Sequence, residues 1–469
     1  MNKVLTTKVT RRDFVKKGSL LALSAGSLPT ILEACSTGGG TTKSGPKTLK
    51  ILQWSHFVPD YDKWFDPWAK QWGTQNNVTV SVDHITYSDI PTRTASEMNA
   101  KSGHDLILWI VPPSQYEQST VDMSDVVKAV EGKYGKQYDF ARLTNFNPHT
   151  NRYFGFTYSF APDPGDYRQS MFQQVGLPNG PSTWEEMLTG VTQIKAKTKG
   201  AVRGGIGFSP EPDSNMAARA LIWSFGGAEQ DADSNVTINS DQVVAAVDYM
   251  ARLYKQAENA EVFGWTAASN NTGLVAGSLS FILNSISAYR TAQGTKPDIA
   301  NDIFFSKPLA GPTAGVKALA SEHVIQTYII PSFSKSQDIA KEFLLYIADH
   351  MTDVAYQSKL YELPVNPGTK AQNSVYGPGG WLDSDPYKSN PAGKLQVLKD
   401  ATTWSVNVGY PGPASPAIGE IFDKNILPSM MAAAARGQRK PKDAVADAEQ
   451  QMKAIFQSWR AKGLVGGSK

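Results

Sequence analysis

The chain has 469 residues, of which 46 are Lys or Arg and 43 are Asp or Glu, for a formal net charge of +3. Six of the bases and two of the acids lie within residues 1–34, so the rest of the chain has 40 bases, 41 acids and a net charge of −1. This balance gives no support for nucleic-acid binding. Because Cys35 is the single cysteine, the chain cannot build a disulfide framework, a cysteine-rich metal site or an iron–sulfur cluster.

Residues 1–34 have the order of features found in an export signal that ends at a lipidated cysteine. Arg11 and Arg12 precede a weakly apolar run at residues 18–32, and Cys35 follows it. The run is too short and too interrupted to span a bilayer. This order resembles a twin-arginine lipoprotein signal peptide and predicts a lipid on Cys35. A basic, frayed N-terminus with a chance cysteine explains the order less well.

The segment after this cysteine predicts a tether. Residues 35–46 are rich in Ser, Thr and Gly, a composition typical of flexible linkers. We therefore expect an exported protein that is anchored by lipid to the cell membrane, on its periplasmic or extracellular face.

Strand and helix patterns alternate at the start of the body, which is long enough for two hydrophobic cores. They predict strand, helix, strand, helix and strand at residues 48–54, 61–72, 78–84, 90–101 and 105–110. This order predicts a largely parallel sheet covered on both faces, with ligands beyond the carboxyl ends of its strands. Trp54, His56 and Trp109 lie at two such ends.

Further elements follow along the chain. Thr183 and Glu186 predict the capped start of a helix at residue 184. Other patterns predict strands at residues 204–208, 279–284 and 323–331, and helices at residues 216–223, 338–350 and 441–459. The glycines at residues 204–208 also predict a close approach of the backbone. Trp64, Trp68 and Trp72 recur at helical spacing, so we expect them to face the core and not a ligand.

Four segments in this order resemble a known family. They are Gly103-His104-Asp105-Leu106, Gly176-Leu177-Pro178 followed by Trp184-Glu185-Glu186, Leu283-Asn284, and Ala340-Lys341-Glu342-Phe343-Leu344. The chain is similar to the extracellular solute-binding proteins (family 1) of carbohydrate ABC transporters, the broad family that includes maltose-binding protein. The resemblance extends from about Thr48 to about Trp459.

The resemblance implies an α/β fold with two lobes, the type II-like periplasmic-binding-protein fold. A cleft separates the lobes, and hinge strands cross between them near residues 156–160, 322–326 and 361–365. Lobe one would then comprise residues 47–158 plus 325–364, and lobe two residues 159–324 plus 365–469.

The resemblance also implies a function. The protein would be the substrate-binding lipoprotein of an ABC importer, capturing a sugar or oligosaccharide in the interlobe cleft and delivering it to the transmembrane permease. We expect a monomer that acts by closing over its ligand, with no catalysis, no cofactor and no nucleic-acid partner.

Candidate site residues follow from sugar chemistry, because a pyranose offers apolar CH faces to aromatic rings and hydroxyl groups to carboxylate, guanidinium and amide partners. The candidate rings are Trp54, Trp109, Trp223, Phe225, Tyr289, Trp404 and Tyr410. The candidate polar partners are His56, Asp105, Asn284, Arg290, Glu322 and His323. By resemblance, residues 284–290 align with an aromatic turn that contacts ligand, where Ser287 replaces a second ring.

Several of these residues have a second interpretation. Asp105 serves equally well to order the start of its strand. Glu322 and His323 could form a hydrogen-bonded pair at the hinge. Tyr410 could stiffen the proline-rich loop that follows it.

Two other functions stay open. A lipid-anchored, glycan-acting enzyme would need two carboxylates across the sugar, and Glu322 and Asp105 are the pair to consider. A binding protein for a polyamine or ferric ion would need clustered carboxylates or paired tyrosines, and neither cluster stands out in the sequence. The six histidines show no metal-ligand spacing, so we predict no metal site.

Overall fold

The computed structural model describes residues 47–467. The predicted signal peptide, Cys35 and the tether lie outside the described residues. Within residues 47–467, no helix combines the length and the apolarity that crossing a membrane requires.

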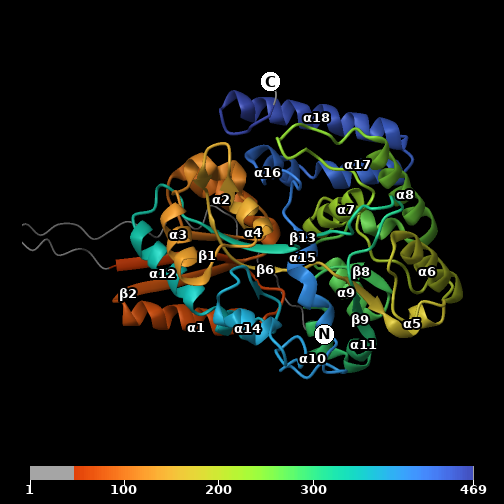
Figure 1. Cartoon of the computed structure of the whole chain (residues 1–469), viewed down its shortest axis with the longest axis horizontal. Coiled ribbons are helices and arrows are strands. Elements are labelled where there is room, and N and C mark those ends of the chain that lie inside the picture. Colours follow the sequence, from red (N-terminus) through yellow and green to blue (C-terminus); the bar gives the residue numbers. More distant parts are fainter. Residues whose placement is uncertain (1–46, 468–469) are drawn as a thin grey trace, which may run out of the picture. The chain divides into compact units, whose positions relative to one another are not determined.

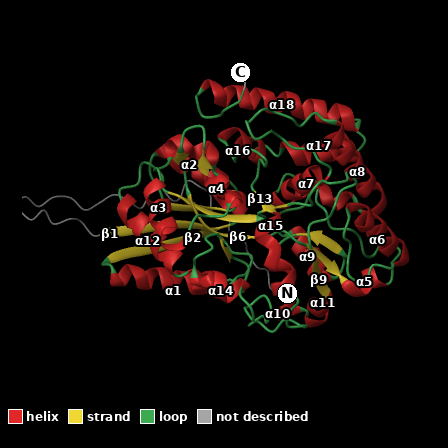
Figure 2. Ribbon diagram, viewed as in Figure 1, coloured by secondary structure: helices red, strands yellow, loops and turns green. Residues whose placement is uncertain are grey.

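A six-stranded sheet organises the first part of the fold (Figure 1, Figure 2). Its spatial order is β12 (Leu363–Pro364), β6 (Phe156–Ala161), β11 (Val324–Ile329), β3 (Leu106–Trp109), β1 (Lys47–Trp54) and β2 (Val78–Ile85). β1 pairs in parallel with β2 and β3, as predicted. The pairs of β11 with β3, β11 with β6 and β12 with β6 are antiparallel, so the prediction of a largely parallel sheet is wrong. βαβ crossovers set the direction of the first three strands only, because β6, β11 and β12 follow other connections.

A second, antiparallel sheet has the order β8 (Phe281–Leu283), β7 (Gly165–Arg168) and β9 (Ile303–Ser306). The chain passes directly from β6 into β7 and returns from β9 through β10 (Ala320–Ser321) to β11. The segments predicted to cross between lobes therefore include β6, β12 and the start of β11, which are neighbours in the larger sheet. Two short pairs complete the sheets, β10 with β13 (Ser405–Val406) and β4 (Phe146–Asn147) with β5 (Arg152–Tyr153).

Helices surround both sheets and complete the two-lobed α/β architecture (Figure 2). Before β6 they are α1 (Asp60–Gln75), η1 (Tyr87–Asp89), α2 (Ile90–Ala100), η2 (Ser114–Ser119), α3 (Ser124–Tyr134) and α4 (Asp139–Asn145). Between β7 and β10 they are α5 (Gln169–Gln173), α6 (Trp184–Lys197), α7 (Pro212–Ser224), α8 (Asp241–Ala257), η3 (Ala260–Phe263), α9 (Ser269–Ala276), α10 (Ser287–Thr295) and α11 (Pro297–Asp302). After β11 they are α12 (Gln337–Asp349), α13 (Met351–Gln357), α14 (Lys370–Tyr376), η4 (Gln396–Asp400), α15 (Ala401–Trp404), α16 (Pro416–Asp423), α17 (Ile426–Ala435) and α18 (Pro441–Ala461). All predicted helices are confirmed.

The aromatic stripe of α1 packs into the core, as its spacing predicts. Trp64 and Trp68 stack with ring centroids 4.9 Å apart, and Trp68 stacks on Tyr346 of α12 at 4.8 Å. Trp72 meets the edge of Phe343 at 4.9 Å. Trp68 and Trp72 thereby hold α1 against α12.

The helix predicted at residue 184 has the expected cap with one change. Thr183 Oγ1 accepts a hydrogen bond from the Glu186 backbone N–H at 3.1 Å. The Glu186 carboxylate accepts in return from the backbone N–H of Ser182 at 2.8 Å, one residue earlier than the usual capping box.

The strand predicted at residues 204–208 does not form. Only Arg203 makes a bridge, to Leu279, and no strand follows it at residues 204–208. The glycines there serve close backbone approach, which was also predicted: a Cβ on Gly205 would lie 2.4 Å from the carbonyl oxygen of Phe281. Tertiary packing, and not pairing with another strand, thus determines the backbone conformation of this segment.

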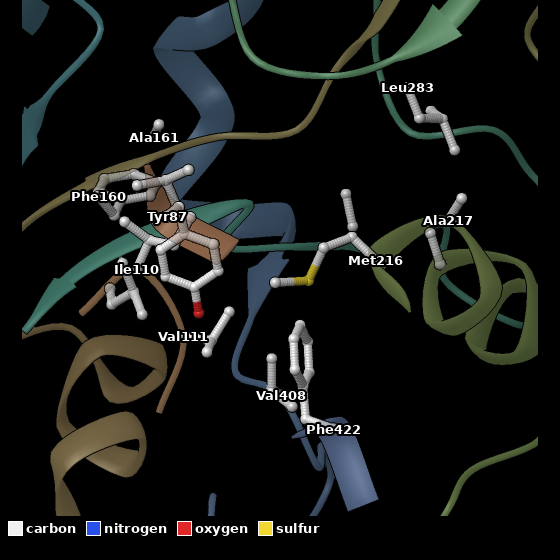
Figure 3. Close-up of a cluster of buried hydrophobic side chains, with 14 of the residues drawn as sticks. Tyr87, Ile110, Val111, Phe160, Ala161, Met216, Ala217, Leu283, Val408 and Phe422 are labelled. Atoms are coloured by element: carbon white, nitrogen blue, oxygen red, sulfur yellow. The ribbon is translucent and has the colours of Figure 1, made fainter. Parts of the chain in front are cut away.

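Apolar side chains join the two sheets into a continuous interior. Figure 3 shows Tyr87 and Val111, which follow β2 and β3, beside Met216 of α7 and Phe422 of α16. All four are at least nine-tenths buried, as is Leu283 of β8 in the same cluster. The interior therefore connects the six-stranded sheet, the three-stranded sheet and the carboxyl-terminal helices.

Candidate ligand-binding cavity

A cavity of about 580 Å³ lies at the carboxyl ends of β1 and β2. One wall consists of residues that directly follow these strands, because the carboxyl ends of parallel neighbours meet at one sheet edge. The other wall comes from the start of α7, the loop before α9 and the connection from α16 to α17. The lining residues are Ser55, Phe57, Thr86, Tyr87, Ser88, Pro91, Pro210, Glu211, Pro212, Trp265, Thr266, Ala267, Ala268, Phe422, Asp423 and Asn425.

Four aromatic rings line the cavity. Phe57 packs on Trp54, with centroids 4.9 Å apart, and presents its other side to the cavity. Tyr87 and Phe422 are mostly buried, whereas Trp265 is half-buried. Rings drawn from both walls provide the flat apolar surfaces on which the CH faces of a sugar pack.

Glu211 places a carboxylate in the wall and also caps α7. Its Oε2 accepts a hydrogen bond from the backbone N–H of Asp213 at 2.7 Å, and its Oε1 accepts from that of Ser214 at 2.6 Å. Pro212, which has no N–H to satisfy, occupies the first helical position. Burial, together with the Asp213 carboxylate, raises the pKa of Glu211 to about 8.

A buried ion pair supports the same wall. Arg219 donates to both carboxylate oxygens of Glu229, with distances of 2.7 and 2.9 Å, and both side chains are almost fully buried. The Arg219 guanidinium also lies against the ring of Phe422 and donates to Asn215 Oδ1 at 3.0 Å. Asn215 Nδ2 in turn donates to Asn425 Oδ1 at 2.8 Å, so two lining residues depend on this arginine.

A second cavity of about 300 Å³ adjoins the first. Trp265, Thr266 and Ala268 line both, so the two cavities share this loop. At the far side, Arg203 Nη1 lies 2.9 Å from Glu261 Oε2.

None of the thirteen residues predicted from sequence is among the described residues that line the larger cavity. Twelve are buried, and Tyr410 is half-buried. The structure brings some of them close to the cavity and gives others internal partners. Their contact with a ligand stays a prediction.

Trp54 and His56 support the wall that Phe57 forms. The His56 ring stacks on Trp54 at 4.8 Å, and His56 Nε2 lies 3.3 Å from Glu362 Oε1. Trp54 Nε1 donates to Gln326 Oε1 at 3.2 Å. These buried contacts fix the segment after β1, from which Ser55 and Phe57 face the cavity.

His323 lies between two carboxylates behind the start of α7. Its Nδ1 is 3.2 Å from Asp163 Oδ1 and its Nε2 is 3.7 Å from Asp213 Oδ1. Burial alone would lower the pKa of His323, but Asp163 and Asp213 hold it at about 9. Burial raises the pKa of Asp213 to about 6 although His323 opposes that change.

Glu322 and Asp105 do not meet across a cleft. Glu322 Oε1 accepts from Thr144 Oγ1 and from the backbone N–H of Val408, each at 3.1 Å, and burial raises its pKa to about 8. Asp105 lies at the amino end of β3 and accepts from Ser334 Oγ at 2.6 Å. Because β3 and β11 are antiparallel, these carboxylates lie at opposite ends of the paired strands. The pair considered for a glycan-acting enzyme is therefore not assembled.

The remaining candidates have protein partners. Trp109 is fully buried beside Tyr116. The other contacts are Asn284 Nδ2 with Asn271 Oδ1, Tyr289 OH with Ser389 Oγ, Arg290 with Asp385, Trp223 Nε1 with the Tyr410 carbonyl, and Phe225 with Tyr249. Trp404 is 4% exposed. These contacts tie loops and helix ends into the core.

Sequence reasoning missed the cavity residues for different reasons. Phe57 and Tyr87 each follow a predicted strand by three residues or fewer, so the strand-end rule could have found both. Trp265 stands in a loop after Gly264, where a large ring without a helical or strand pattern signals a surface role. Phe422 lies on an apolar helix, and nothing in the sequence separates it from core residues.

A family profile described as bacterial extracellular solute-binding protein matches residues 67–393. Because this match covers more than half of the chain, the protein belongs to the bacterial extracellular solute-binding proteins, a family of binding proteins and not of enzymes. The resemblance noted from the sequence is thereby confirmed. No curated protein sequence matches the chain.

Solved structures confirm the two-lobed fold. Maltose-bound MalE3 of T. maritima superposes with a TM-score of 0.72 at 16% identity, over 87% of this chain and 99% of that one. An ABC transporter solute-binding protein from Thermotoga lettingae TMO, bound with alpha-D-tagatose, gives 0.71 at 17% identity over 87% and 99%. The GacH receptor of Streptomyces glaucescens GLA.O, solved unliganded and with acarbose, gives 0.68 at 15% identity over 88% and 99%.

Proposed function

We propose that this protein captures a sugar or oligosaccharide in the cavity beside Trp265 and delivers it to the permease of an ABC importer. The observation that supports the proposal is the cavity wall, which combines four aromatic rings with hydroxyl, carboxylate and amide groups. That combination suits the two surfaces of a pyranose. Structures of the same fold hold maltose, alpha-D-tagatose and acarbose, which agrees with this ligand class.

Capture would work through closure. In the proposed division, lobe one is residues 47–158 plus 325–364 and supplies Phe57 and Tyr87 to the ligand. Lobe two is residues 159–324 plus 365–469 and supplies Trp265. A ligand that contacts both lobes favours the closed arrangement over the open one, and the permease would recognise that closed form. Among the residues predicted from sequence, we propose that Trp54 and His56 act by supporting the lobe-one wall.

The proposed location is the outer face of the cell membrane, with the chain held by a lipid on Cys35. Radiolabelled lipid should enter the full-length protein, and Cys35→Ser should abolish the label and release the protein from the membrane fraction. Arg11→Lys with Arg12→Lys should block export if the twin-arginine route is used. Label on the Cys35→Ser variant would contradict the anchor.

A thermal-shift screen of residues 47–469 tests the ligand class. The ligands would be neutral and charged mono- and oligosaccharides, polyamines and iron chelates. A ligand that binds only the folded state stabilises it by about 2.7 kcal/mol at a hundredfold excess over Kd. We expect a shift with one group of sugars and recovery of the sugar intact. A shift with polyamines or iron alone, or a cleaved sugar, would reject the proposal.

A further inference from the structure

The lining of the cavity contains two carboxyl groups and no basic side chain. Glu211 and Asp423 are its ionisable acids, and no Lys, Arg or His occurs among the described residues that line it. The other polar lining groups are the hydroxyls of serine, threonine and tyrosine residues and the Asn425 amide. An anionic ligand would therefore meet like charge and no ion-pair partner.

Basic side chains around the wall are neutralised by other acids. Arg219, which touches Phe422, is paired with Glu229. Lys424 follows Asp423 in sequence, but its Nζ lies 2.7 Å from Glu420 Oε1. His323, the cation behind the start of α7, lies between Asp163 and Asp213, so all three cations have acidic partners of their own.

The carboxyl groups of Glu211 and Asp423 differ in how many hydrogen bonds they can still accept from a ligand. Glu211 uses both oxygens to cap α7, so its carboxyl group is held in place in the wall. Asp423 accepts one hydrogen bond through Oδ2, from Gln115 Nε2 at 2.6 Å, and its exposed carboxylate can accept more. Burial and the Asp213 carboxylate raise the pKa of Glu211, and burial raises the pKa of Asp423 to about 7, so a bound cation would stabilise the negative form of both groups.

The aromatic rings favour the same ligand charge. A cation over the face of an aromatic ring gains about 0.5–2 kcal/mol, most with tryptophan. Trp265 is half-buried and lies on the cavity opposite Phe57 and Tyr87. A charged amine inside the cavity could thus contact both aromatic rings and carboxyl groups of its lining.

We propose that the cavity selects sugars that carry a protonated amino group over the neutral and anionic sugars of the same shape. The inference rests on the proposed function, since it assigns the charge of a carbohydrate ligand. The ring hydroxyls of the sugar would bond to the lining hydroxyl and amide groups. Its ammonium would lie near Asp423, in the field of Glu211.

Matched disaccharides test this selectivity. Sets with gluco, galacto and manno configuration would carry a hydroxyl, an acetamido, an amino or a carboxylate group at one position. Binding would be measured by calorimetry at pH 7, where an amine with a pKa of about 8 is mostly protonated and Asp423, with a pKa of about 7, is partly ionised. We expect the amino member of at least one set to bind at least tenfold more tightly than its hydroxyl partner, and this ratio to fall as salt is raised from 20 to 200 mM.

Two variants assign the effect to the cavity. Asp423→Asn should remove most of the preference for the amine and leave the melting temperature of the free protein nearly unchanged. Glu342→Gln, the same change on an exposed residue of α12, should leave the preference intact. If hydroxyl or carboxylate sugars bind as well as amino sugars, the selectivity is overturned while sugar capture stands. If only polyamines bind, or no carbohydrate of any charge binds, both proposals fall.

Discussion

The guanidinium carbon of Arg219 lies 4.9 Å from the centroid of the Phe422 ring, so a buried ion pair forms the support of a cavity wall. Arg219 has its charge satisfied by Glu229 and its direction fixed by Asn215. The Phe422 ring therefore packs on a guanidinium that these hydrogen bonds hold in place. This arrangement links the stability of α7 to the shape of the ligand site.

Replacing Arg219 should affect stability and binding separately. Arg219→Met leaves Glu229 buried without its partner, which should lower the free energy of unfolding by about 3–5 kcal/mol. The double variant Arg219→Met with Glu229→Leu should recover most of that loss. It should still bind sugar about 3- to 30-fold more weakly, because Phe422 loses its support. Thermal melts and titration calorimetry measure the two effects. Unchanged affinity in the double variant would show that the ring needs no such support.

Two tryptophans should respond in opposite ways to truncation. Trp265 is half-buried in the cavity, so Trp265→Ala should raise the Kd for sugar at least tenfold, about 1.4 kcal/mol, with little change in melting temperature. Trp223 is 4% exposed and donates to the Tyr410 carbonyl at 3.1 Å. Trp223→Ala should cost about 3–5 kcal/mol of stability. The reverse pattern would place the ligand beside Trp223, as predicted from the sequence.

A pH effect on stability should arise at the start of β3. His104 Nδ1 lies 2.7 Å from Glu97 Oε1, and its Nε2 lies 3.0 Å from Asp83 Oδ2. Burial alone would lower the pKa of His104, but the two carboxylates raise it above 6.5. Burial alone would raise the pKa of Glu97, but hydrogen bonds from His104 and Arg93 lower it to about 2.

The direction of each pKa shift determines the pH range in which His104 and Glu97 stabilise the folded state. Because the pKa of His104 is higher in the folded state, its contribution is complete below about pH 6.5 and is lost as pH rises through the folded pKa. Glu97 contributes above about pH 4.5 and loses its contribution as pH falls towards 2. The melting temperature of the unaltered chain should exceed that of the His104→Asn variant by the largest margin between about pH 4.5 and 6.5. Parallel curves for the two chains would contradict this assignment.

Arg290 offers a test of a residue first considered for the ligand. Its side chain is 1% exposed, and its Nη1 lies 2.6 Å from Asp385 Oδ2. Arg290→Met should cost about 3–5 kcal/mol, and Arg290→Met with Asp385→Leu should cost much less. Differential scanning calorimetry measures both. Loss of sugar binding at an unchanged melting temperature would instead make Arg290 a ligand contact.

Much of the fold could be predicted because local patterns agree with the final packing. The Trp64, Trp68 and Trp72 stripe indicates both a helix and the face that it buries. The direction of β11 could not be predicted, since a strand pattern carries no information about which neighbour it joins. The glycines at residues 204–208 signalled close approach, but the sequence does not distinguish a ladder from loop packing.

The site was harder to predict than the fold. Strand ends located the right edge of the sheet, and Trp54 and His56 lie just behind the residues that line the cavity. Aromatic and charged residue types alone could not separate Trp223, which packs inside, from Trp265, which lines the cavity. That difference depends on which loops the tertiary fold brings together.

The direction of β1 separates the first residues of the body from the cavity. The strand begins at Lys47, where the proposed tether ends, and its last residue, Trp54, is followed by the cavity residue Ser55. Eight residues of strand span about 26 Å. The amino end of the body and the cavity wall at Ser55 therefore lie a strand length apart, so a change to the segment before Lys47 would leave the ligand contacts untouched.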